Sequence, residues 1–304
     1  MTKRGHYTTL SVNVRKDICL MAQIIQWFPG HMAKAFRLMR ENLKLVDVVF
    51  ELVDSRIPES SHNPEVDKLI GNKPRLLIMT KADLADPDQT RAWKKHFEAQ
   101  GYTVLVLDTR DPRTPQLVTK AARRAVEAKK VAQLAKGIQD QPIRAMISGV
   151  PNVGKSTLLN HLVMKNVAPT ADRPGVTKKI AWLKTPTKLE LLDSPGVLWP
   201  KFEDQNIGMK LALTGAVKDT IFAKDDAALF LINFFREYRP EAIIDRYHLN
   251  DNIFDQENVD VLLSITSKLG FKDDYDKASE RILNDLRKNK LGAFTLDLIE
   301  TKND

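Results

Sequence analysis

Residues 149–156 read Gly-Val-Pro-Asn-Val-Gly-Lys-Ser and match the pattern G-x-x-x-x-G-K-[ST] of a phosphate-binding loop. The apolar run at 143–148 predicts a strand before this loop, and residues 155–162 predict a helix after it. Glycines permit a tight turn in which backbone N–H groups and the helix N-terminus face phosphate oxygens. The loop in this context predicts a nucleotide-binding domain.

Two side chains of the loop have specific expected roles. Lys155 is expected to lie on the β- and γ-phosphates, and the Ser156 hydroxyl is expected to bind Mg²⁺. The predicted nucleotide-binding set is completed by their neighbours, which are Asn152, Val153, Gly154 and Thr157.

Two later motifs fit the parts of such a domain that respond to the γ-phosphate. Residues 193–196, Asp-Ser-Pro-Gly, follow a predicted strand, so Asp193 can reach the Mg²⁺ shell and the Gly196 N–H can contact a γ-phosphate. The second motif, Arg-Pro-Gly-Val-Thr at 173–177, lies between the phosphate loop and residues 193–196, and its Thr177 can supply a second hydroxyl to Mg²⁺. The alternatives are a common D-x-x-G turn and an exposed Pro-Gly turn.

A guanine-reading motif lies upstream, at residues 80–83, Thr-Lys-Ala-Asp, directly after the apolar strand 74–79. The Asp83 carboxylate can accept hydrogen bonds from both N1–H and the 2-amino group of guanine, which adenine does not offer. The stem of Lys81 is expected to lie over the base plane. The motif therefore predicts selection of guanine.

The rest of the chain predicts an α/β fold, a doubly wound mostly parallel sheet with a smaller all-α C-terminal domain. Helical periodicity follows residue 196, and no strand is evident there. The expected division is an N-terminal extension at 1–22, a nucleotide-binding domain at 23–203 and a helical domain at 204–304. The predicted strands are 46–53, 74–79, 103–107, 143–148 and 189–192; helices are expected at 32–45, around Trp93, at 115–136 and at 155–162.

Charge and composition narrow the class of protein. Over 304 residues the formal net charge is +8, which favours polyanionic partners, although a merely soluble basic protein is the alternative. Cys19 is the only cysteine, which excludes an intrachain disulfide and a cysteine-rich metal site. The sequence has neither an apolar run of membrane-spanning length nor a convincing signal peptide, so we expect a cytoplasmic protein without a membrane partner.

The order of these motifs is permuted, because the guanine motif precedes the phosphate loop. Together with Ile-Gln-Trp-Phe-Pro-Gly-His-Met-Ala-Lys at 25–34, this order resembles the circularly permuted GTPases of the ribosome biogenesis GTPase A family. The resemblance runs from about residue 23 to the end. It implies a GTP hydrolase that drives late assembly of the large (50S) ribosomal subunit, docking on its 23S rRNA and leaving on hydrolysis. The implied cofactors are GTP or GDP and Mg²⁺, and we expect a monomer.

The sequence departs from the family pattern at both guanine loops. Thr80 stands where the family has asparagine, so weaker nucleotide binding is expected while Asp83 still selects guanine. The second guanine loop is assigned by position alone to Asp108 and Thr109.

Three further positions bear on hydrolysis. Val197 occupies the place where many small GTPases have a water-orienting glutamine, so the free protein should be slow and a partner should accelerate it. His31 is the candidate for orienting water; the alternative is a histidine that caps or packs the helix 32–45. Asn152 resembles the asparagine of potassium-stimulated GTPases, which adds K⁺ to the expected cofactors.

Other interpretations of the whole chain stay open. Basic residues of the helical domain are a candidate rRNA surface or merely solvated faces. Trp27 and Phe28 are core anchors or base-stacking residues. The protein is a GTPase, an RNA-binding assembly factor whose nucleotide is a structural ligand, or an ATPase of similar fold. For the permuted GTPase, a γ-phosphate contact at Gly196 can reorient residues 205–304 through the short connection 197–206.

Overall fold

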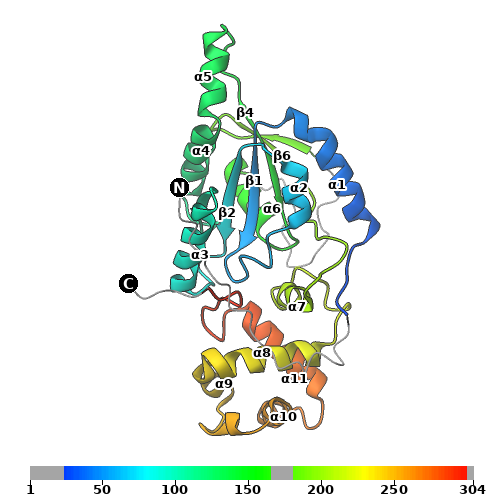
Figure 1. The fold of residues 1–304 in the computed structure, drawn as a ribbon. Coiled ribbons are helices and arrows are strands. Elements are labelled where there is room, and N and C mark those ends of the chain that lie inside the picture. Colours follow the sequence, from blue (N-terminus) through cyan, green and yellow to red (C-terminus); the bar gives the residue numbers. More distant parts are fainter. Residues whose placement is uncertain (1–23, 166–180, 300–304) are drawn as a thin grey trace, which may run out of the picture.

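A computed structural model describes residues 24–165 and 181–299 of the chain (Figure 1). Six strands form one sheet in the order β3-β2-β1-β4-β6-β5, and all neighbours pair in parallel except β5 and β6. The strands are β1 (Val48–Asp54), β2 (Arg75–Thr80), β3 (Thr103–Val106), β4 (Ile143–Gly149), β5 (Ala181–Lys184) and β6 (Leu189–Asp193). This arrangement confirms the predicted mostly parallel sheet.

Central strands of the sheet are buried on both faces. All seven residues of β1 are buried, as are the last five of β2 and of β4. Helices cover both faces, with α2 and α6 on opposite sides (Figure 1). The continuous apolar runs of the sequence follow from this double coverage. The helices of this part are α1 (Gly30–Asn42), α2 (Pro64–Ile70), α3 (Pro87–Ala99), α4 (Thr114–Ala125), α5 (Glu127–Ala135) and α6 (Lys155–Val163).

The remaining helices form a separate group beyond one end of the sheet (Figure 1). In this group α8 packs against α9, α10 and α11. The members are α7 (Gln205–Leu213), α8 (Lys224–Tyr238), α9 (Pro240–Tyr247), α10 (Asn258–Lys268) and α11 (Tyr275–Arg287). Among the described residues, no helix has the length and apolar character needed to cross a membrane.

Several elements differ from the sequence prediction. The helix expected over 115–136 is two helices, because Val126 between α4 and α5 has φ −112° and ψ 9°. The helix expected over 32–45 is α1 followed by a 3₁₀ turn at Leu43–Leu45. Two short elements, α2 and β5, were not predicted.

The last described residues return to the sheet. The Leu296 N–H donates to the Arg56 carbonyl at 2.7 Å, and the Trp93 indole N–H donates to the Asp297 carbonyl at 2.7 Å. Ile299 belongs to a small apolar cluster with Trp93 and residues of β1 and β2. The chain end thus joins the helical group to the sheet, although the division at 203/204 assigns it to the helices.

The topology brings the functional motifs to one edge. Strands β1, β2, β4 and β6 end at Asp54, Thr80, Gly149 and Asp193, and their parallel pairing places these carboxyl ends together. Ligands of doubly wound folds bind at this edge of the sheet. Thr177 and the N-terminal extension 1–22 lie outside the described residues.

Candidate nucleotide-binding site

The loop between β4 and α6 has the backbone that its glycines require. Gly149 has φ +150° and Gly154 has φ +105°, and both values lie in the region that favours glycine. A Cβ on Gly149 would meet the Leu52 carbonyl oxygen at 2.6 Å. The loop therefore passes close to β1 and delivers the N-terminus of α6 to the edge of the sheet, where its N–H groups can face an anion.

Lys155, the first residue of α6, is folded over this loop. Its buried Nζ donates to the carbonyl oxygens of Gly149 at 2.9 Å and Val150 at 2.7 Å. Burial lowers the pKa of the Lys155 ammonium to about 8, and the nearby charge of Asp193 opposes the shift. The group is a cation held in a dry loop, where its charge acts strongly on a phosphate.

The Asp-Ser-Pro-Gly motif packs directly on the same loop. A Cβ on Gly196 would lie 2.8 Å from Pro151 Cα and 3.0 Å from Lys155 Nζ, so only glycine fits without a shift. The Val197 N–H donates to the Gly149 carbonyl at 3.3 Å. A displacement of Gly196 would therefore change its packing against the loop and against Lys155.

Asp193 is a candidate magnesium ligand. Burial raises the pKa of its carboxyl to about 6, while the charge of Lys155 works against that rise. Its Oδ1 is buried and has no hydrogen-bond partner among the described residues. An unpaired carboxylate oxygen beside a phosphate loop is the donor type that Mg²⁺ prefers, so the residues present fit this ion.

Thr80 joins the guanine motif to the phosphate loop. This buried side chain lies with its Oγ1 2.6 Å from the Val153 carbonyl oxygen and 3.1 Å from that of Val53. Weaker nucleotide binding is expected at this position, because the family has asparagine there. The threonine hydroxyl nevertheless bridges to the phosphate loop. Its side chain is shorter than that of asparagine.

Lys81 has a positive φ of +55° and is fixed by a buried acid. Its Nζ lies 3.0 Å from Asp54 Oδ2, and the Arg56 guanidinium contacts the same carboxylate at 2.7 Å. Burial of Asp54 would raise its pKa, but the charges of Arg56 and Lys81 hold it well below the usual range. The lysine stem is thus held at the edge of the sheet.

Asp83 meets the second guanine loop through an arginine. Arg110 Nη2 lies 2.5 Å from Asp83 Oδ2 and 3.3 Å from Asp108 Oδ2, so one guanidinium bridges the two carboxylates. His161 on α6 donates from Nδ1 to the Thr109 carbonyl at 2.8 Å. The loop assigned by position therefore does lie beside both Asp83 and α6. Arg110 was missed as a member of the site, and its place directly after that loop was the available signal.

Comparison with known proteins agrees with this geometry. A family model described as "50S ribosome-binding GTPase" matches residues 144–291. Ribosome biogenesis GTPase A of Priestia megaterium is 46% identical over 279 residues, covering 90% of this chain and 96% of that protein. Mitochondrial ribosome-associated GTPase 1 of Mus musculus is 32% identical over 300 residues, covering 90% of each. The chain belongs to the ribosome biogenesis GTPase A family.

Solved structures agree on the fold. GNP-bound YlqF from T. maritima matches with a TM-score of 0.56 at 22% identity, covering 87% of this chain and all of that one. A GDP-bound YlqF gives a TM-score of 0.58 at the same identity. The predicted α/β fold of the permuted GTPases is confirmed.

Asn152, the candidate potassium residue of this family member, contacts the helical group. It has φ +57°, and its Nδ2 donates to the Gly215 carbonyl at 2.7 Å, just after α7. Arg287 of α11 donates to the carbonyls of Leu213 and Ala212 next to it. The phosphate loop is therefore hydrogen-bonded directly to the helices that follow the connection.

His31 is not brought to the phosphate loop. It is exposed in the first turn of α1, with its ring 6.4 Å from that of Trp27 in an edge-on arrangement. Within the described part of the chain, no hydrogen bond, ion pair or ring contact joins His31 to residues 149–156. Trp27 itself is buried in the core, which fits its interpretation as an anchor.

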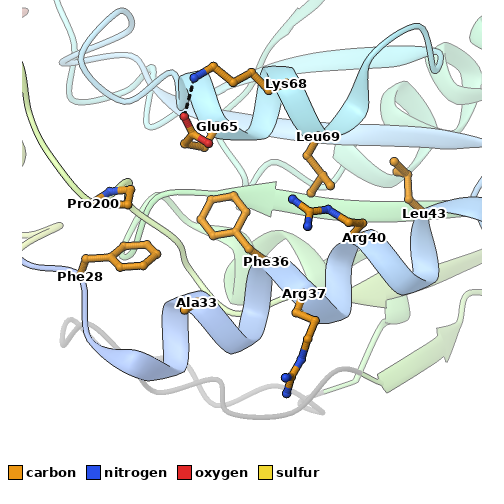
Figure 2. A pocket seen from close by; sticks show the side chains of 10 residues that line it. All are labelled: Phe28, Ala33, Phe36, Arg37, Arg40, Leu43, Glu65, Lys68, Leu69 and Pro200. Atoms are coloured by element: carbon orange, nitrogen blue, oxygen red, sulfur yellow. Dashed lines mark hydrogen bonds and ion pairs between the residues drawn. The ribbon is translucent and has the colours of Figure 1, made fainter.

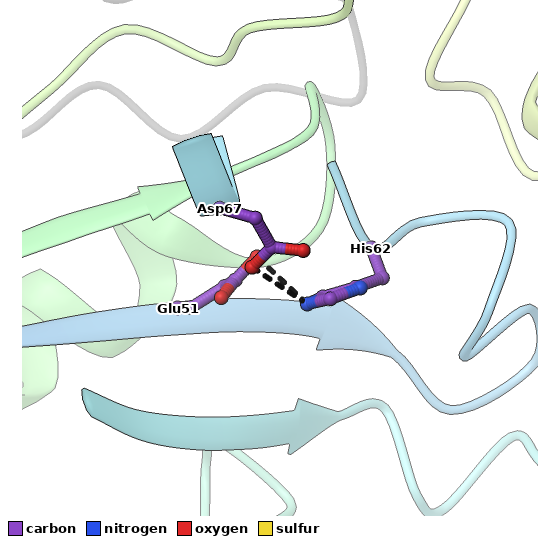
Figure 3. A group of neighbouring side chains, drawn as sticks. All are labelled: Glu51, His62 and Asp67. Atoms are coloured by element: carbon purple, nitrogen blue, oxygen red, sulfur yellow. Dashed lines mark ion pairs between the residues drawn. The ribbon is translucent and has the colours of Figure 1, made fainter. Parts of the chain in front are cut away.

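A second cluster of ligand-type side chains lies away from this edge. Glu51, His62 and Asp67 point toward one another with ligand atoms within 4.8 Å (Figure 3). Arg75 also pairs with both carboxylates. Burial lowers the pKa of His62, but the carboxylates of Asp67 and Glu51, each 3.4 Å from its Nε2, outweigh this effect and raise that pKa to about 10. His62 and Arg75 already pair with both carboxylates, so in this structure the cluster is an ion-pair network.

Proposed function

We propose that this protein binds and hydrolyses GTP to drive late assembly of the large (50S) ribosomal subunit, as a cytoplasmic monomer that docks on 23S rRNA and leaves on hydrolysis. The observation that carries the proposal is the bond between Thr80 and the Val153 carbonyl at 2.6 Å. It ties the guanine motif to the phosphate loop although 73 residues separate them. The names of the relatives support the ribosomal part.

Phosphate binding falls to the loop and to Lys155. The N–H groups at the start of α6 supply fixed partial charges, and the ammonium adds a full one. Because Nζ already bonds to two loop carbonyls, it is held near the phosphate position without ordering a flexible chain. Gly196 packs closely on Pro151. In our proposal its N–H meets the γ-phosphate, so we expect this packing to differ between the GTP and GDP states.

Among the described residues, Ser156 and Asp193 are the donors that would hold magnesium, and Thr177, outside the described residues, is our third candidate. When bound there the ion neutralises charge on the β- and γ-phosphate oxygens. Asp193 contributes a carboxylate whose ionised form burial disfavours, so a cation beside it restores that form.

Water activation is the weak step of the free protein. The Val197 side chain is buried and apolar, so it neither donates a hydrogen bond to a water nor accepts one from it. Hydrolysis is therefore slow until the ribosomal partner supplies or orders a group, for which His31 is our candidate. Asn152 places an amide at the loop, and its Oδ1 is the atom that would be offered to K⁺, because its Nδ2 donates to the Gly215 carbonyl.

Guanine selection falls to Asp83, with Lys81 beneath the base and residues 108–109 beside it. Arg110 neutralises the two carboxylates that face this end of the site. An ATPase of the same fold would leave Asp83 opposite the acceptor N1 of adenine, which is unfavourable.

Two connections join the nucleotide site to the helical group. The connection 197–206 runs from Gly196 into α7, and the Asn152–Gly215 bond links the loop to the end of α7. We propose 23–203 as the GTPase domain and 204–304 as the helical domain that meets rRNA. The γ-phosphate thereby biases how the helices present themselves to the subunit.

The experiment that tests this function is co-sedimentation with immature large subunits in sucrose gradients, in GDP and in a non-hydrolysable GTP analogue. Binding in the analogue and release in GDP are expected. A protein that binds equally in both states and retains activity in vivo as Lys155→Ala is instead an RNA-binding factor with a structural nucleotide.

A further inference from the structure

A groove lies between α1, α2 and the connection 197–206 (Figure 2). Its volume is about 520 Å³, and its floor carries the rings of Phe28 and Phe36 with the side chains of Leu43 and Leu69. Pro200 of the connection forms one end, close to Phe28 (Figure 2). The groove thus joins the N-terminal segment, a helix of the sheet domain and the chain that leaves the Gly196 motif.

The aromatic rings of this groove are only partly used by the core. Trp27 is 8% exposed and packs inside, whereas Phe28 and Phe36 are half-buried at the edge of the core. Their centroids are 6.3 Å apart and their planes are inclined by 34°. Each ring therefore packs on the core and leaves part of its surface to the groove.

Positive charge lies beside these rings: Arg40 extends over the groove near Leu69, and Arg37 extends from the other side of α1 (Figure 2). Arg37 and Arg40 are exposed on α1, and neither forms an ion pair with a described carboxylate. Lys68 is different, because it pairs with Glu65 at 2.7 Å and the two charges cancel. The unbalanced charge of the groove is therefore positive and comes from α1.

Exposed aromatic surface flanked by unpaired arginines suits one class of ligand. Single-stranded nucleic acid offers π-faces that stack on aromatic side chains, and phosphates that pair with cations. An apolar protein helix would use the rings but would leave Arg37 and Arg40 without counter-charges. A duplex would satisfy the arginines but would keep its bases stacked away from the rings.

We propose that this groove binds a single-stranded RNA segment, with a base stacked on Phe28 and Phe36 and the flanking phosphates on Arg37 and Arg40. The inference rests on the proposed function, since it assumes an RNA-bearing partner, and it adds a contact on the GTPase domain itself. Occupancy also touches the connection at Pro200.

That contact has a structural path to the nucleotide site. Gln26 donates from Nε2 to the Pro200 carbonyl at 2.8 Å, and the Leu198 N–H contacts Met32 Sδ of α1 at 3.4 Å. The connection that follows Gly196 is therefore held against the segment that carries the groove. RNA bound there lies against the part of the chain expected to move with the γ-phosphate.

The test measures binding of a fluorescein-labelled oligouridine of about 12 nucleotides, within the site size of single-strand binding proteins, to the full-length protein by fluorescence anisotropy. Phe36→Leu keeps an apolar side chain against the core but removes the stacking surface, so Kd should rise about tenfold. Arg40→Gln should raise Kd and make the salt dependence shallower by about one phosphate contact.

The matched control is Lys95→Gln, which removes one exposed charge on α3 and should leave Kd and its salt slope nearly unchanged. A wild-type protein that does not bind the oligonucleotide, or a Phe36→Leu variant that binds it as tightly as the wild type, overturns the inference. A photo-crosslinker in place of Phe36 should attach to RNA in immature large subunits, and attachment to a protein also overturns it.

Failure of the groove and failure of the function are distinguishable. If Phe36→Leu binds RNA normally while subunit-stimulated GTP hydrolysis is intact, only the groove inference is lost. If the wild-type protein does not hydrolyse GTP in any condition, the proposed function is lost whatever the anisotropy shows.

Discussion

Replacing Asp83 by asparagine should change which base the protein binds. The carboxylate offers two acceptor oxygens to the N1–H and 2-amino donors of guanine, whereas the amide offers one acceptor and one donor. Asp83→Asn should therefore weaken GDP binding and strengthen binding of xanthosine diphosphate, which carries an acceptor in place of the 2-amino group. The shape of the side chain is unchanged, so the fold should be unaffected.

The structure sets the size of the effect. Hydrogen bonds to a charged group contribute about 1.5–3 kcal/mol each, and two are at stake. The Asp83 side chain is 29% exposed and already contacts Arg110, so the lower end of that range applies. The expected loss is about 3 kcal/mol, which corresponds to a rise of roughly 100-fold in Kd for GDP.

The assay is displacement of a fluorescent GDP by GDP, xanthosine diphosphate and ADP. The control is Asp88→Asn, which neutralises an exposed carboxylate in the first turn of α3 and should bind GDP as the wild type does. An Asp83→Asn protein with wild-type GDP affinity and no gain for xanthine would refute the assignment of this carboxylate to the base.

Three further predictions follow from particular contacts. Thr80→Val removes the hydroxyl that donates to the Val153 carbonyl, so the free energy of unfolding in urea should fall by about 1–3 kcal/mol and GDP should bind more weakly. Thr80→Ser keeps a hydroxyl and should retain both the stability and the affinity for GDP. A valine variant as stable as the wild type would contradict the bridge. The pKa of His62 is raised to about 10 in the folded protein, so the stabilisation by its charge is complete below pH 6.5 and is lost as the pH rises through 10. Between pH 7 and 10 the free energy of unfolding of the wild type should therefore fall by on the order of 4 kcal/mol more than that of His62→Gln. Parallel curves for the two proteins would count against the ion-pair network. GTP hydrolysis should be faster in K⁺ than in Na⁺, and Asn152→Ala should abolish that difference; a wild-type rate independent of the cation removes Asn152 from the potassium role.

The sheet was predictable because its signal is local. Strands buried on both faces are mostly apolar, and β1, β2 and β4 are so apart from single charged residues such as Glu51, Arg75 and Arg144. The break at Val126 carries no glycine or proline, so periodicity ran through it and joined α4 to α5. The four-residue edge strand β5 was too short to give a pattern.

The site was predictable where a motif ends a strand. Lys155, Asp193 and Thr80 meet at one edge because parallel strands carry their carboxyl ends there. Contacts between distant segments were not predictable. The bond from Asn152 to Gly215 spans 63 residues, and Arg110 reaches Asp83 across 27, so only the folded chain reveals them. His31 stays a prediction, since in this structure its ring lies near Trp27, away from the loop, and its proposed role requires the N-terminal segment to reach the switch motifs.

GTP hydrolysis by the full-length protein, measured with and without immature large ribosomal subunits, tests the central claim most directly. The account predicts slow turnover alone, marked acceleration by the subunit, no comparable turnover of ATP, and loss of turnover in Lys155→Ala. Rates that ignore the subunit, or a Lys155→Ala protein that hydrolyses GTP as fast as the wild type, would contradict it.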